Sequence, residues 1–121
     1  MNDTVTLRYK NHTITLRAWL TNRQREQIRQ LDALAQRAGL PYSTETISEF
    51  LLALAYTIEG DEDIWSRPKT MPATGEALRE AIEAWLDAPA SYTRALMDAI
   101  LRDDPLAEDG ATPLPEDADP N

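Results

Sequence analysis

The pattern of apolar positions along the chain begins with two short alternating runs. Apolar and polar residues alternate from Thr4 to Tyr9 and again from Thr13 to Arg17, with Lys10, Asn11 and His12 between them. Two such runs around a short turn predict a β-hairpin over residues 4–17, with positive φ at Asn11 and His12 exposed on the turn. An isolated hairpin is marginal in water, so its apolar face is expected to rest on helices.

The stretch from Ser43 to Gly60 predicts the central helix of the protein, over residues 44–59. Ser43 or Thr44 can cap its start, and Gly60 can supply a left-handed residue after its end. Apolar side chains cover nearly the whole circumference of this helix, which is typical of a helix enclosed by neighbours. The stretch is too short to cross a bilayer and carries Glu49, so a soluble core helix is expected.

Three further helices are expected around it, over residues 22–38, 75–86 and 90–102. Thr21 and Gln24 have the spacing of a capping box, and apolar residues recur at helical spacing from Ile28 to Ala38. Trp19, just before this helix, is expected to pack in the core. The fold class is therefore mainly α, with an N-terminal β-hairpin on about four helices in one domain over residues 1–102.

The composition predicts a disordered tail and a cellular compartment. Of 121 residues, 42% are hydrophobic and 27% are charged, which are ordinary values for a globular chain. The net charge of −9 is concentrated after Arg102, where acidic residues, proline and small residues predict a disordered tail over residues 103–121. Cysteine is absent, and polar residues follow Met1 where a signal peptide would be apolar. A cytoplasmic protein is expected, with no membrane span.

No arrangement of residues in the sequence predicts catalysis. With His12 as the single histidine and no glycine-rich phosphate loop, neither a metal site, a bound cofactor nor a paired nucleophile is expected. The acidic run Asp61–Asp63 lacks the spacing of a calcium loop and is expected to be a solvated loop. The sequence therefore predicts a binding protein and not an enzyme.

Four residues are candidates for contact with a partner protein. Arg23, Arg25 and Arg29 place positive charge on the helix 22–38 in a chain that is acidic overall. Trp65 lies in the loop 61–75, where it either anchors the loop to the body or contacts a partner. Reversing the three arginine charges together is expected to weaken partner binding and to leave the fold intact.

The whole of residues 4–102 resembles the tail assembly chaperones of long-tailed bacteriophages and prophages. The resemblance rests on VTLRYKNHTITLR followed by a Thr-capped basic helix, the apolar helix from Phe50 to Ile58, the acidic loop, and two later helices led by prolines. It implies transient binding to the long apolar tape-measure protein, or to the tail-tube protein, in the host cytoplasm. Basic and apolar helix surfaces are suited to cover an amphipathic partner helix.

A shorter stretch resembles ribbon-helix-helix DNA-binding proteins, and this alternative stays open here. TITLR followed by LDALAQRAGLPYSTETISEFLLAL is similar to their strand and two helices. The resemblance implies that Thr13, Thr15 and Arg17 of a dimeric ribbon enter the major groove and that the helix start at residues 43–44 touches phosphate. Nucleic acid is nevertheless not the expected partner, because the chain is acidic and phosphate neutralisation dominates DNA binding. Another small cytoplasmic interaction module is the third possibility, and the oligomeric state stays open.

Overall fold

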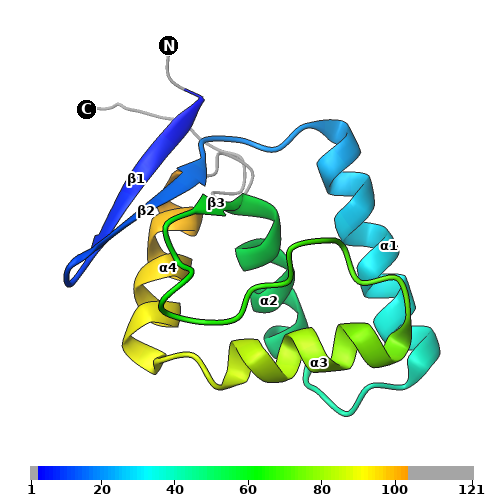
Figure 1. Ribbon diagram of the computed structural model, residues 1–121. Coiled ribbons are helices and arrows are strands. Elements are labelled where there is room, and N and C mark those ends of the chain that lie inside the picture. Colours follow the sequence, from blue (N-terminus) through cyan, green and yellow to red (C-terminus); the bar gives the residue numbers. More distant parts are fainter. Residues whose placement is uncertain (1–2, 104–121) are drawn as a thin grey trace.

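The computed structural model describes residues 3–103 and has the expected class, a mainly α protein with an antiparallel sheet at its N-terminal end (Figure 1). The elements follow in the order β1 (Thr4–Tyr9), β2 (His12–Arg17), α1 (Asn22–Ala38), α2 (Thr44–Tyr56), β3 (Thr57–Glu59), α3 (Gly75–Leu86) and α4 (Ala90–Asp103). The predicted disordered tail falls outside the described residues, apart from Asp103 at the end of α4.

The hairpin is confirmed, and its turn differs in one detail. β1 and β2 pair antiparallel, with Tyr9 opposite His12 at the turn. The positive φ of 52° falls at Lys10 and not at Asn11 as expected. The ring of His12 is half-buried and stacks on Tyr9, with 6.4 Å between ring centroids, so His12 is less exposed than a turn residue would be.

A third strand corrects the predicted end of the central helix. α2 ends at Tyr56 and not at residue 59, and β3 pairs with β2 to give the order β1-β2-β3. Gly60 follows β3 with φ of 103°, and a Cβ there would lie 2.1 Å from the Thr13 carbonyl oxygen. Residues 57–59 are Thr-Ile-Glu, which fit either a helix end or a short strand, and the pairing with β2 decides for a strand.

α2 is the centre of the molecule, as expected from its apolar circumference. It packs against α1, α3 and α4, while α4 also packs on β1 (Figure 1). Phe50 and Ala53 are fully buried, and Leu51 is 3% exposed. One core cluster therefore joins the sheet and all four helices through α2.

Local capping explains where the helices begin. Thr21 and Gln24 form the expected capping box, with Gln24 N donating to Thr21 Oγ1 at 3.2 Å and Thr21 N donating to Gln24 Oε1 at 2.8 Å. Ser43 and Thr74 accept from backbone N–H groups at the starts of α2 and α3. α1 ends at Gly39, whose φ of 63° is left-handed.

Trp19 is exposed and does not pack in the core, which corrects the expectation for this residue. Its side chain is 49% exposed in the segment between β2 and α1. The neighbouring Arg17 turns toward α2 instead, where its Nε donates to the Ala55 carbonyl oxygen at 3.0 Å. Among residues 3–103, no helix combines the length and the apolar character that a bilayer crossing requires.

Candidate functional site

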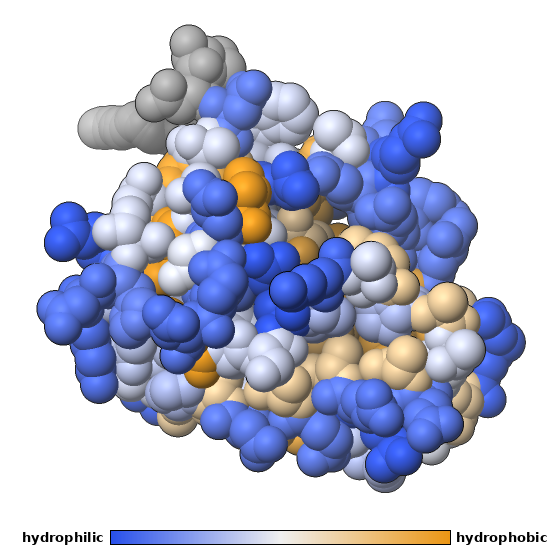
Figure 2. Space-filling view, viewed as in Figure 1, coloured by the Kyte–Doolittle hydropathy of each residue, from blue (hydrophilic) through white to orange (hydrophobic). Residues whose placement is uncertain are grey.

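A shallow apolar groove lies between α1, α3 and the segment of residues 68–74 that leads into α3. Two adjoining hollows of about 550 and 340 Å³ form it, and they share three residues of that segment. The apolar residues that line the apolar groove include Met71, Pro72, Ala73, Ala77, Ala81, Ala84 and Leu34, and polar side chains such as Gln27, Gln30, Arg37 and Glu80 complete its lining. Figure 2 shows pale orange surface bordered by blue residues over α3 and the segment before it.

The floor of the apolar groove is made of small side chains. Ala77, Ala81 and Ala84 recur at spacings of four and three, so they lie on one side of α3. Met71 stands at the edge with 43% of its surface exposed, while Pro72 is buried. Small floor residues beside an exposed methionine leave room for an apolar side chain of another molecule to approach the helix closely.

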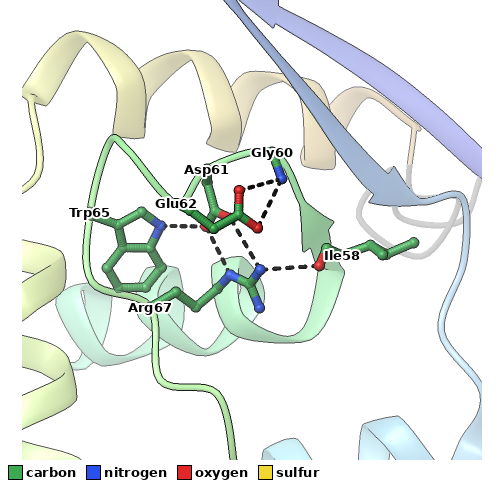
Figure 3. Close-up of polar contacts among 6 residues, drawn as sticks. All are labelled: Ile58, Gly60, Asp61, Glu62, Trp65 and Arg67. Atoms are coloured by element: carbon green, nitrogen blue, oxygen red, sulfur yellow. Dashed lines mark hydrogen bonds and ion pairs between the residues drawn. The ribbon is translucent and has the colours of Figure 1, made fainter.

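The segment that forms one wall of the groove is fixed by a buried ion pair next to β3. Asp61 is fully buried, and its Oδ2 accepts from Arg67 Nε at 2.8 Å. Arg67 Nη2 donates to Asp61 Oδ1 at 3.0 Å and to the Ile58 carbonyl oxygen at 3.1 Å (Figure 3). The expectation of a solvated acidic loop is therefore wrong at Asp61. The guanidinium of Arg67, six residues later, forms a bidentate ion pair with both carboxylate oxygens of Asp61.

Electrostatics reinforce this pair. Burial by itself would lower the pKa of Arg67, but the Asp61 carboxylate more than offsets that effect, and the pKa is raised above its ordinary value. Glu62 lies outside the pair and accepts from the Gly60 N–H through its carboxylate, at 3.0 and 3.3 Å. In the turn after β3, the exposed Glu62 carboxylate accepts from a backbone N–H, and the buried Asp61 carboxylate accepts from the Arg67 guanidinium.

Trp65 is the third member of the cluster and belongs to the core. Its Nε1 donates to Asp61 Oδ2 at 2.7 Å, and its side chain is 6% exposed. The indole makes edge contacts with Phe50 and Trp85, at centroid distances of 6.4 and 5.1 Å. The structure supports the anchoring interpretation of Trp65 and corrects its assignment as an exposed partner contact.

The contacts among Asp61, Trp65 and Arg67 help to position the wall of the apolar groove. Asp61, Trp65 and Arg67 hold the first part of the loop against α2 and β3 (Figure 3). The chain then runs on through Pro68 to Thr74, which caps α3. Since Met71 lies between these two fixed points, the ion pair and the helix cap together position it over α1 and α3.

The three predicted arginines do not form one face. Arg25 and Arg29 are one helical turn apart, but Arg23 points about 200° away from Arg25 around the helix. Arg29 also pairs with Glu26, at 3.0 Å between Nη2 and Oε1. Arg23 and Arg29 are exposed and Arg25 is half-buried, and none of them lines the apolar groove. Their role in partner binding stays a prediction.

The polar side chains around Asp61 lie deep in the protein. The fully buried Asp61 carboxylate accepts three hydrogen bonds, two from Arg67 and one from Trp65. The buried Tyr92 hydroxyl has no hydrogen-bond partner within residues 3–103, and burial, with the Asp61 carboxylate adding to it, raises the pKa of Tyr92. In the same part of the chain, no three histidine or acidic side chains converge as metal ligands would.

Comparison with known proteins gives no relative. No protein-family model, no curated protein and no solved structure matches this chain.

The apolar groove could not be predicted from the sequence, because it depends on which side of α3 faces α1. The signal was present in part, as the spacing of Ala77, Ala81 and Ala84 and the prolines at 68 and 72. Alanine is compatible with core and surface alike, so its spacing alone does not indicate a binding surface.

Proposed function

We propose that this chain is a non-catalytic binding protein, a tail assembly chaperone of a long-tailed phage, and that it holds an apolar helix of the tape-measure protein in the apolar groove. The observation that carries the proposal is the groove itself, with exposed Met71 beside the alanines of α3. The resemblance of residues 4–102 supports the choice of partner.

The dimensions of the groove suit a helix. Ala77 to Ala84 covers about 10 Å along α3, at about 1.5 Å per residue. That length accommodates two turns of an amphipathic partner helix. Such a helix contacts a groove through side chains that are three, four and seven residues apart. Arg37 and Glu80 stand at the border, so polar groups of either sign on the partner find a complement there. Binding of this kind shields apolar side chains of the partner from water.

The geometry does not favour the ribbon-helix-helix alternative. A DNA-reading ribbon needs the strand with Thr13, Thr15 and Arg17 to pair with the same strand of a second chain. Here β2 is the middle strand, and both of its edges are taken by β1 and β3 of its own chain. We therefore propose protein binding, and not DNA binding, as the function.

Affinity capture of the tagged protein from its native lysate tests the proposal. Mass spectrometry and nucleic-acid detection on the eluate are done for the parent, for Met71→Glu and for Leu86→Glu. Leu86 is the matched control, since it is an apolar residue of α3 that is 49% exposed and does not line the apolar groove.

We expect a long, helical tape-measure-like protein in the eluates of the parent and of Leu86→Glu, and at least a tenfold smaller amount with Met71→Glu. A charge placed on the groove must be desolvated when an apolar helix covers it, which opposes binding. If Met71→Glu captures the partner as well as the parent does, the apolar groove is not the binding site. Salt-sensitive DNA without such a protein would favour the ribbon-helix-helix alternative.

A further inference from the structure

We infer that the outer edge of β1 pairs with β1 of a second copy of this chain, antiparallel and with Thr6 on the two-fold axis. This inference concerns the opposite end of the molecule from the apolar groove (Figure 1). It stands on the strand register and does not depend on the proposed function.

The register of the hairpin determines which backbone groups of β1 point outward. Tyr9 opposite His12 closes a two-residue loop, and Leu7 then lies opposite Ile14. In an antiparallel pair, residues that exchange hydrogen bonds alternate with residues that do not. Ala18 N donates to the Asp3 carbonyl oxygen at 2.8 Å, which shows that the odd-numbered residues of β1 bond inward. The N–H and C=O groups of the even-numbered residues therefore point away from β2.

Those outward groups belong to Thr4, Thr6 and Arg8. Within residues 3–103, β1 is an edge strand, and no backbone hydrogen bond reaches its outer side. A row of unpaired donors and acceptors on a straight edge is a template for another strand. Proteins usually block such an edge with proline, a bulge, charged side chains or a very short strand. β1 has six residues, no proline and a single charged residue, Arg8, and the irregularity in this sheet lies between β2 and β3.

β1 is also held in place for pairing. Its odd-numbered side chains face α4, where the Tyr9 hydroxyl bonds the Ser91 hydroxyl at 2.6 Å and the Tyr9 ring meets Tyr92 edge-on. Because the strand is already ordered by α4 and β2, a second strand loses less conformational entropy on docking than it would against a mobile edge.

Only one register uses every outward group. With Thr6 opposite Thr6 of the second copy, Thr4 lies opposite Arg8 of that copy, and each of these residues exchanges both of its backbone bonds. Val5 then lies opposite Leu7 of the second copy, so the half-buried apolar row continues across the junction. No like charges face each other in this register. A shift by two residues leaves either Thr4 or Arg8 without a partner strand residue.

The occupant is therefore a second copy, since β1 is complementary to itself in sequence and in hydrogen bonding. The two copies form one six-stranded sheet, with α4 of each copy on the same face. The two apolar grooves lie at the far ends of this assembly, where both stay open. Two grooves on one dimer would hold two helices of a long partner and strengthen its capture by multivalency.

Sedimentation of the full chain over a concentration series tests the pairing. The parent is expected to reach twice the chain mass of 13.6 kDa as concentration rises. Thr6→Pro removes an outward N–H that the monomer does not use, which an edge strand tolerates. Thr6→Lys places like charges opposite each other across the axis. Both variants are expected to stay monomeric with parental circular dichroism, while the control Thr15→Lys, one strand inward and beside Glu59, is expected to dimerise.

Single cysteines test the register, because the chain has none of its own. Thr6→Cys places two sulfurs across the axis with about 5.5 Å between Cα atoms, within the range that a disulfide bridges. We expect Thr6→Cys to form a covalent dimer on mild oxidation, and Thr4→Cys and Thr13→Cys to dimerise without forming a disulfide. A parent that stays monomeric throughout the series overturns the inference, as does a dimer that persists in Thr6→Pro and Thr6→Lys. Stronger cross-linking through Thr4→Cys or Thr13→Cys overturns the register.

Discussion

Replacing Asp61 by asparagine tests the buried ion pair that anchors the wall of the groove. The substitution keeps the shape of the side chain and removes its charge. It leaves Arg67, whose side chain is 19% exposed, facing a neutral amide, and one carboxylate oxygen becomes an NH₂ group that accepts nothing from Arg67 or Trp65.

The expected loss of stability follows from these contacts. Removing one partner of a buried ion pair costs about 3–5 kcal/mol, because the other charge stays buried without compensation. Arg67 can turn partly toward water, so we place Asp61→Asn at about 3 kcal/mol, the lower end of that range. For a domain of about 100 residues, each kcal/mol lowers Tm by about 4–8 °C, which gives a fall of about 12–24 °C.

Two companion variants make this prediction specific. Asp63→Asn changes an exposed acid two residues away and is expected to shift stability by about 0.5 kcal/mol or less. Asp61→Asn with Arg67→Met removes both charges, and we expect it to recover at least about 1.5 kcal/mol relative to Asp61→Asn alone.

Urea unfolding followed by circular dichroism at 222 nm and by tryptophan emission gives all three free energies. Asp61→Asn unfolding at the same urea concentration as Asp63→Asn would refute the reasoning, since Asp61 would then be as solvated as its neighbour. A double variant as unstable as Asp61→Asn would show that the unpaired guanidinium is not the source of the loss.

Three further predictions concern the turn after β3, the buried phenol and the central helix. Gly60→Ala should cost about 3 kcal/mol or more in urea unfolding, because its Cβ meets the Thr13 carbonyl, while Gly39→Ala, with open space around it, should cost about 1–2 kcal/mol. Above pH about 10 an unfolded tyrosine loses its proton while Tyr92, with its raised pKa, keeps it, so the folded state binds more protons and stability falls. Tyr92→Phe should therefore lose less stability than the parent between neutral pH and pH 11, and a parallel loss in both would contradict this. Leu51→Asp should unfold the domain by circular dichroism, and a parental melting curve would mean that Leu51 is not in the core.

Local rules account for what was predictable from the sequence. The bounds of α1 and α3 follow from their Thr21 and Thr74 caps and from apolar spacing, both of which involve only neighbouring residues. The hairpin follows from alternation around a short turn. The burial of α2 follows from its apolar circumference.

The errors arise from tertiary pairing and from side-chain contacts within a loop, neither of which the pattern of apolar and polar positions reveals. Thr57–Glu59 becomes a strand because β2 lies beside it, not because of its own residues. Asp61 is buried because Arg67 and Trp65 converge on it. Trp19 is exposed, and the nearby Arg17 contacts α2 through the Ala55 carbonyl oxygen. The candidate groove was missed for the same reason, since it forms only where α1 and α3 meet.

Site-specific photo-cross-linking to a co-expressed tape-measure protein shows whether a partner helix binds in the apolar groove. A benzophenone side chain is placed at Met71 in one variant and at Leu86 in another, so that two similarly exposed positions are compared. Helix binding in the apolar groove predicts an adduct from position 71 and little or none from position 86. Equal adducts from both positions, or an adduct from position 86 alone, would contradict it.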